Sequence, residues 1–120
     1  MRGISEEVSV YLWLGVMDMR IGFDRLALFI KERLQRDVLS GGLYVFLSRR
    51  RDRVKIMYWD RDGYALWFKR LEAGVFRVES FEKHEEITGI DLQELLRGVE
   101  LNRIKFRKNI NQGIAQSVSV

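Results

Sequence analysis

The sequence predicts a small α+β protein in which a small antiparallel sheet packs with two helices. Three observations predict this class: an alternating apolar segment at residues 8–14, an apolar stripe with helical spacing at residues 23–34, and a three-stranded meander within residues 43–70. One or two further strands are expected to complete the sheet.

The first strand and the first helix follow from two different apolar periods. Residues 8–14 place Val or Leu at every second position, which predicts a strand that Gly15 ends. Apolar residues then recur at helical spacing from Phe23 to Leu34, which predicts an amphipathic helix. Charged residues, including Arg33, occupy most of its remaining positions.

The meander is predicted from three β-rich segments that follow the glycine pair 41–42 and are separated by two short polar turns. If both turns are four-residue loops, Trp59 lies opposite Tyr64 and the register of all three strands is fixed. Gly63 supplies a permissive backbone position in the second loop.

This register divides the meander into two apolar faces. One face, expected to pack as core against the first helix, collects Leu43, Val45, Leu47, Val54, Ile56, Tyr58, Ala65 and Trp67. The other face is strongly aromatic and collects Tyr44, Phe46, Lys55, Met57, Trp59, Tyr64, Leu66 and Phe68. An antiparallel sheet often keeps one polar face. The aromatic face must therefore be covered by the first strand and second helix, by a partner subunit or by a ligand.

The last third of the chain is less strongly patterned. A short strand is expected at residues 75–78, then a charged loop at residues 80–90. A short helix is expected within residues 88–98, where Asp91 and Glu94 have the spacing of a capping box.

Length and composition limit the organisation and the location of the protein. The 120 residues suffice for one domain, and we expect residues 1–100 to form a single α+β domain and residues 101–120 a basic, then polar, flexible tail. The absence of Cys excludes disulfides and thiolate metal sites. Glu6 and Glu7 stand where a signal peptide needs apolar residues, so we expect a cytoplasmic protein without a membrane partner.

Charge is unevenly distributed along the chain. Residues 49–70 hold eight Lys or Arg and three Asp or Glu, whereas residues 71–100 hold three basic and eight acidic residues. A basic block attracts polyanions such as nucleic acid. The alternative is that the acidic block folds back on the basic block and neutralises it.

The basic and aromatic meander is the best candidate for a binding site. The candidate nucleic-acid contacts are Arg49, Arg50, Arg51, Arg53, Lys55, Arg61, Lys69 and Arg70. The candidate stacking or docking surface consists of Tyr44, Phe46, Trp59, Tyr64 and Phe68. Phosphates bind Arg and Lys, and unpaired bases stack on aromatic rings. The alternative is that these aromatic residues are core and the arginines are solvated.

Catalytic and metal-binding candidates are weaker. Asp52, Asp60 and Asp62 are carboxylates of the kind that bind metal ions, but Asp in a hairpin turn commonly serves the turn itself. His84 is the only histidine and lies in a charged loop, where a solvated role is more common than catalysis. The sequence therefore predicts no catalytic residue, no metal site and no cofactor.

Several uncommon strings recur in the same order in one known family. They are Asp18-Met19-Arg20, Gly22-Phe23-Asp24, Ser40-Gly41, Val45-Phe46, Arg50, Lys55, Trp59-Asp60, Asp62-Gly63, Leu66-Trp67, Lys69-Arg70-Leu71-Glu72, Gly74 and Phe76. Over roughly residues 8 to 100, the chain resembles the TnpB-type accessory proteins of the IS66 family of bacterial insertion sequences. Val38 and Glu79 stand near positions where many relatives carry proline, a difference that concerns turn rigidity.

The resemblance implies a role in transposition beside a separate, larger transposase, and it carries over no catalytic residue. We therefore expect a non-catalytic accessory protein that binds nucleic acid, such as the DNA of the element ends, through the basic and aromatic meander. The alternative is a protein-interaction adapter that forms a homodimer, or docks on the transposase, through the aromatic face.

Overall fold

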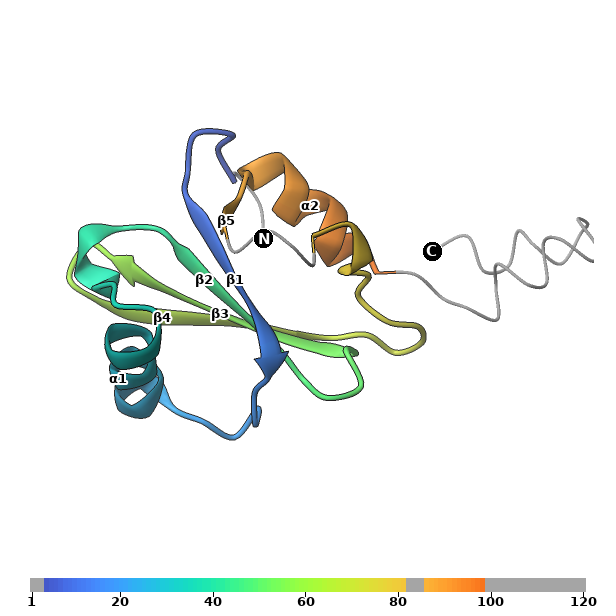
Figure 1. The fold of residues 1–120 in the computed structure, drawn as a ribbon, viewed down its shortest axis with the longest axis horizontal. Coiled ribbons are helices and arrows are strands. Elements are labelled where there is room, and N and C mark those ends of the chain that lie inside the picture. The colour runs from blue at the N-terminus through green and yellow to red at the C-terminus, as the bar shows by residue number, and fades with distance from the viewer. Residues whose placement is uncertain (1–3, 82–85, 99–120) are drawn as a thin grey trace, which may run out of the picture.

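Five strands form one mixed sheet in the order β4-β3-β2-β1-β5, with a helix on each face (Figure 1). The computed structural model describes residues 4–81 and 86–98. The strands are β1 (Val10–Val16), β2 (Leu43–Leu47), β3 (Arg53–Asp60), β4 (Gly63–Arg70) and β5 (Glu86–Ile87). The helices are α1 (Phe23–Arg33) and α2 (Gly89–Arg97), with short 3-10 turns η1 (Val38–Ser40) and η2 (Glu79–Phe81). The predicted α+β class is confirmed, and no described helix could span a membrane.

The meander of β2, β3 and β4 has the predicted register, because Trp59 pairs with Tyr64. The second loop is shorter than predicted, since pairing continues to Asp60 and Gly63 and leaves only two residues between the strands. The left-handed backbone conformation belongs to Arg61, with φ 58°, and not to Gly63. A two-residue hairpin loop needs positive φ within the loop itself, and Gly63 already belongs to the strand.

The sheet is mixed and not wholly antiparallel, because β1 pairs with β2 in parallel. A parallel pair needs a long crossover connection, and the segment that contains α1 and η1 supplies it. The register shifts between Trp13 and Val16, so β1 contains an irregularity there. Gly15 lies inside this irregularity and does not end the strand as predicted.

The helix that covers each face differs from the prediction. The face that was expected to pack against the first helix packs against α2 instead, since Val45 and Ile56 belong to one core cluster with Leu92 and Leu95. The aromatic face is covered by α1, whose Leu26 is fully buried in the second cluster. Because both faces are apolar, the alternation alone did not show which helix covers which face. The right-handed sense of a parallel crossover decides the side on which α1 lies.

The predicted strand at residues 75–78 is an irregular segment that buries Phe76 and Val78 on the α2 side of the sheet. The fifth strand is β5, which lies in the region predicted to be a charged loop. β5 pairs antiparallel with β1, with Ile87 opposite Val10. A strand of two residues is too short to show an alternating pattern, which is why the sequence did not indicate it.

The second helix is confirmed, with a different cap. Thr88 accepts a hydrogen bond from the backbone N–H of Asp91, and the Asp91 carboxylate accepts one from the backbone N–H of Thr88. The capping box is therefore Thr88 with Asp91, one turn earlier than the predicted pair of Asp91 and Glu94. His84 and the predicted tail at residues 101–120 lie outside the described residues.

Lys55 is a buried cation that joins β3 to the loop between β1 and α1. Its side chain is 9% exposed, and Nζ donates to the backbone carbonyls of Met19 at 2.6 Å and Ile21 at 2.8 Å. Nζ also lies 5.5 Å from the centroid of the Phe68 ring. These partners satisfy a charge that would otherwise be costly to bury, and they hold the loop against the sheet.

We expect Lys55→Met to lower the free energy of unfolding by about 1–3 kcal/mol, because it leaves the two loop carbonyls without their charged donor. The measurement is urea denaturation. The control is Lys31→Met on an exposed position of α1, with an expected change below about 0.5 kcal/mol. Equal destabilisation by the two substitutions would show that the Lys55 hydrogen bonds contribute nothing specific.

Candidate nucleic-acid interface

The predicted cations do not form one continuous patch. Arg49, Arg50, Arg53 and Arg70 lie at one end of the sheet, where the β2–β3 turn and the end of β4 meet. Arg61 lies in the β3–β4 turn, at the other end of β3, about 25 Å away for a strand of eight residues. We call the first group the arginine end.

Three further predicted contacts have structural roles. Lys55 binds loop carbonyls, as described above, and Lys69 Nζ donates to the carbonyl of Leu96 near the end of α2 at 3.0 Å. Arg51 is partly buried in the β2–β3 turn, where its carbonyl accepts a hydrogen bond from the Phe76 N–H at 2.7 Å. The side chains of Lys55 and Lys69 therefore stabilise the fold, whereas Arg51 contributes its backbone carbonyl.

Arg53 and Arg70 form the centre of the arginine end. They lie directly opposite each other on β3 and β4 and line a shallow depression together with Phe68 and Glu72. The Phe68 side chain is 52% exposed. Arg70 Nη2 lies 3.4 Å from Glu72 Oε2, which neutralises part of its charge.

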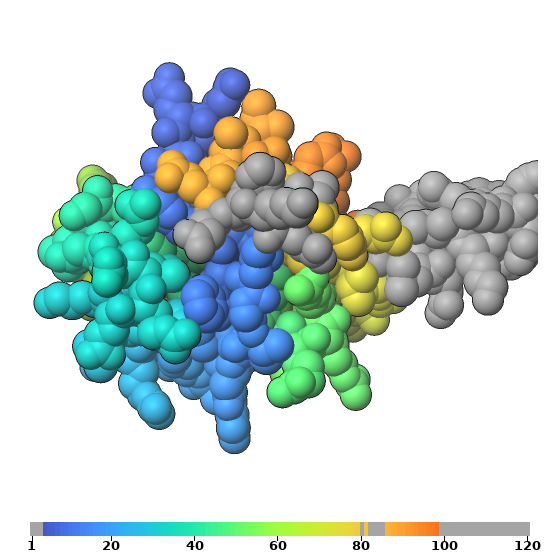
Figure 2. All heavy atoms as spheres, in the orientation of Figure 1, coloured from blue at the N-terminus to red at the C-terminus, as the bar shows by residue number. Residues whose placement is uncertain are grey.

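Two neighbouring depressions share Arg53 as a lining residue. One lies over the β2–β3 turn and is lined by Ser48, Arg49, Arg50, Asp52 and Arg53. The other lies between this turn and the segment after β1, and is lined by Val16, Met17, Asp18, Met19, Arg20, Ser48, Arg49 and Arg53. Both segments project at the lower edge of the molecule in Figure 2. Arg53 thus joins three shallow sites into one basic surface.

The carboxylates near this surface are engaged within turns. The Ser48 hydroxyl donates to Asp52 Oδ1 at 3.1 Å and accepts a hydrogen bond from the Arg53 backbone N–H at 3.1 Å. Asp60 and Asp62 lie at the other hairpin. Within residues 4–81 and 86–98, no three His, Cys, Asp or Glu residues come together in a way that could hold a metal ion.

Arg20 also lies at the arginine end, although the sequence reasoning did not select it. Its Nε and Nη2 donate to the Asp18 carboxylate, the shortest contact being 2.6 Å, and its backbone N–H donates to Asp18 Oδ1 at 2.9 Å. Both side chains are exposed. The spacing of Asp18 and Arg20 was visible in the sequence, but only the depression shared with Arg49 places the pair at this surface.

The aromatic face is divided by α1. Tyr44 and Phe46 are 2% and 0% exposed, so they are core residues and a docking surface made of the whole face is not available. Trp59 and Tyr64 form an edge-to-face pair with ring centroids 5.4 Å apart near the β3–β4 turn. Tyr64 and Phe68 are the exposed members, and they lie toward opposite ends of β4.

The side-chain hydrogen bond from Arg20, supported by its backbone N–H, holds the pKa of Asp18 well below the ordinary carboxyl value. The stability that this pair contributes is therefore present above the pKa of Asp18 in the unfolded chain. It is lost as the pH falls through the pKa of Asp18 in the folded protein.

We expect Arg20→Gln to raise the pKa of Asp18 in an NMR titration of the carboxyl carbon. Arg49→Gln in the same depression is the control, and an equal rise there would show that the effect is not specific to the Arg20 contact.

The chain is similar to known proteins over most of its length. The family model described as "IS66 Orf2 like protein" matches residues 8–106. "Uncharacterized protein y4hO" of Sinorhizobium fredii is 36% identical over 97 residues, which cover 80% of this chain and 84% of that protein. "Uncharacterized protein y4jC" of the same organism is 33% identical over 76 residues, which cover 63% of this chain and 65% of that protein. No solved structure matches the chain significantly. The chain belongs to the IS66 Orf2-like family of insertion-sequence proteins.

Proposed function

We propose that this protein is a non-catalytic accessory protein of transposition that binds the DNA of its insertion sequence through the arginine end. Membership of the IS66 Orf2-like family supports the association with an insertion sequence. The exposed arginines around Arg53 support the binding of a polyanion, since guanidinium groups form paired hydrogen bonds with phosphate oxygens.

The observation that carries the proposal is the pairing of Arg53 with Arg70. Like charges directly opposite each other on neighbouring strands destabilise a sheet. The two arginines also flank Phe68, a large apolar side chain that is half exposed. Folding gains little from this arrangement, whereas a ligand that neutralises both charges and covers the ring would stabilise it. A phosphate backbone supplies the negative charge, and sugar or base surfaces supply the contact with the ring.

The test compares two double variants in their binding to duplex DNA from the ends of the element. Arg53→Ala with Arg70→Ala is expected to weaken binding by about tenfold or more at low salt, because two phosphate contacts are lost. The slope of log affinity against log salt should become shallower by roughly two. Fluorescence anisotropy over a range of salt concentrations measures both quantities.

The matched control is Arg25→Ala with Lys31→Ala, which removes the same charge from exposed positions of α1, away from the arginine end. It should change the affinity by less than about threefold through the lower net charge. If the two double variants bind equally well, the arginine end is not the DNA site. Urea denaturation of both variants checks that neither loss is due to unfolding.

A protein-interaction role is the second candidate, and the edge-to-face pair of the partly buried Trp59 and the exposed Tyr64 favours it. Such a pair at the tip of a hairpin offers an aromatic contact to the transposase or to a second copy of this chain. Tyr64→Lys is expected to weaken that association without unfolding the protein, because Tyr64 is 36% exposed. Sedimentation velocity of the protein, alone and with the transposase, measures the association, and a monomer in both cases would exclude this role.

A further inference from the structure

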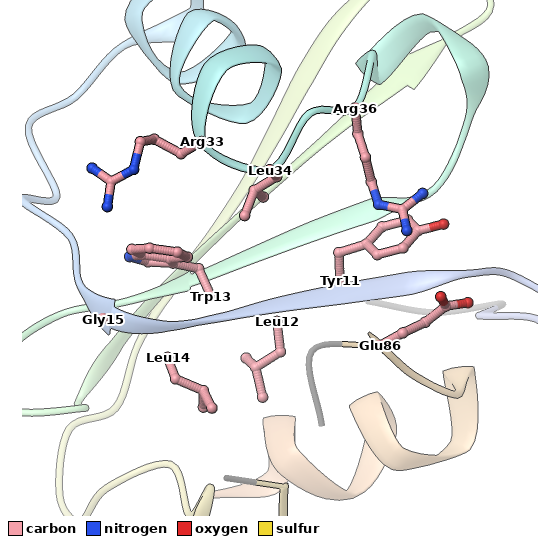
Figure 3. A pocket seen from close by; sticks show the side chains of 9 residues that line it. All are labelled: Tyr11, Leu12, Trp13, Leu14, Gly15, Arg33, Leu34, Arg36 and Glu86. Carbon is pink, nitrogen blue, oxygen red and sulfur yellow. The ribbon is translucent and has the colours of Figure 1, made fainter. Parts of the chain in front are cut away.

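A deeper cavity lies between β1 and the end of α1, away from the Arg53–Arg70 pair (Figure 3). Its volume is about 460 Å³. It is lined by Tyr11, Leu12, Trp13, Leu14, Gly15, Arg33, Leu34, Arg36 and Glu86. Its size falls within the range of small-molecule sites, which is about 300–1,000 Å³.

The cavity lies beside the short pairing of β1 with β5. β5 pairs with only two residues of β1, with Ile87 opposite Val10 and Glu86 opposite Tyr11. Residues 11–15 of β1 line the cavity. The irregularity at Gly15 lies in the same stretch. Residues of β1 and Glu86 of β5 therefore form one wall of the cavity.

Two arginines are held over aromatic rings of β1. Arg36 Cζ lies 3.9 Å from the Tyr11 ring centroid, and Tyr11 in turn stacks on Tyr44 at 5.1 Å. Arg33 Cζ lies 5.4 Å from the centroid of Trp13. Figure 3 shows both guanidinium groups on the α1 side of the strand. No carboxylate of the described residues forms an ion pair with either arginine. Cation–π contacts thus hold both charges at the wall of the cavity.

Gly15 fixes the position of the Trp13 ring. A Cβ atom at position 15 would lie 2.7 Å from Trp13 Nε1 and 2.9 Å from Trp13 Cε2. Only glycine lets the indole lie against the irregular part of β1. The indole also makes an edge-to-face contact with Phe29, with ring centroids 5.1 Å apart. The indole is therefore a rigid, partly exposed ring in the wall of the cavity.

These groups match one ligand chemistry best. Two cations select phosphate groups, and a rigid indole selects a planar ring. Glu86 is the acid among the described residues of the lining and can accept a hydrogen bond from the amino group of cytosine. An acidic peptide would satisfy the arginines, but it would be repelled by Glu86 and need not offer a ring to Trp13. In a duplex the base faces are already stacked, so contact with Trp13 requires an unpaired base.

The cavity adjoins the arginine end along β1, although the two share no lining residue. It ends at Gly15, and the depression that contains Arg49 and Arg53 begins at Val16. The stretch from Tyr11 to Val16 is about 17 Å long at the rise of an extended strand. One strand of nucleic acid that leaves the arginine end can therefore follow β1 into the cavity.

We infer that this cavity binds single-stranded nucleic acid, with an unpaired base packed against the exposed part of the Trp13 indole and the adjoining phosphates held by Arg33 and Arg36. The inference rests on the proposed function and adds to it the class of nucleic acid that the protein takes. An unpaired segment at an element end would then be held beside the duplex bound at the arginine end.

The test measures binding of a short deoxycytidine oligomer by fluorescence anisotropy. Arg33→Ala with Arg36→Ala is expected to weaken binding by about tenfold or more, because two phosphate contacts are lost. The matched control is Arg25→Ala with Lys31→Ala, which removes the same charge from exposed positions of the same helix. The control should lose less than about threefold.

Stacking is tested by tryptophan fluorescence. The oligomer is expected to quench the emission of the parent protein, and Trp13→Phe should remove most of this quenching while it keeps an aromatic ring in the core. Quenching that persists in Trp13→Phe, or equal affinities for the two arginine double variants, would overturn the inference. A response to an acidic peptide without any response to the oligomer would also overturn it and assign the cavity to a protein partner.

The two proposals fail in different measurements. Loss of oligomer binding in the Arg33 and Arg36 variant, with duplex binding kept, assigns the single-strand site to the cavity. If Arg53→Ala with Arg70→Ala leaves duplex binding unchanged, the proposed DNA surface is wrong, whereas the result with the deoxycytidine oligomer still decides the cavity.

Discussion

The central strand β2 has apolar side chains on both sides, and all five of its residues are buried. Val45 points to one face of the sheet, and Tyr44 and Phe46 point to the other. Burial of apolar surface contributes about 25 cal/mol per Å², so neither face can be left in water without a large loss of stability. The chain therefore needs one layer on each face, and α1 and α2 supply these layers. The remaining features of the molecule follow from this requirement.

The lengths of the elements determine which part of the aromatic face remains exposed. α1 has eleven residues, so it is about 16 Å long and 10 Å wide. β3 and β4 have eight residues each, which correspond to about 26 Å. The helix covers the middle of the face, and the strand ends extend beyond it with Arg53, Phe68 and Arg70 on one side and Tyr64 on the other. The candidate DNA surface is therefore a consequence of a short helix on long strands.

The parallel pairing of β1 with β2 determines the second site. Because the crossover returns the chain to the start of β2, the end of α1 passes over β1. Arg33 and Arg36 belong to the polar part of an amphipathic segment, which is usually a solvated surface. In the folded protein they lie over Trp13 and Tyr11 instead. This contact joins residues from two elements, so neither segment indicates it alone.

The sequence by itself determined the strands of the meander, the pairing of Trp59 with Tyr64 and the positions of the two helices. Short loops and apolar periods fix these features locally, within a few residues. Only the tertiary structure decided that α1 covers Tyr44 and Phe46, that β1 runs parallel to β2, and that Lys55 serves the fold. A strand with apolar residues on both faces does not indicate which helix covers which face of the sheet. The direction of the β1–β2 crossover and the packing of distant segments decide this.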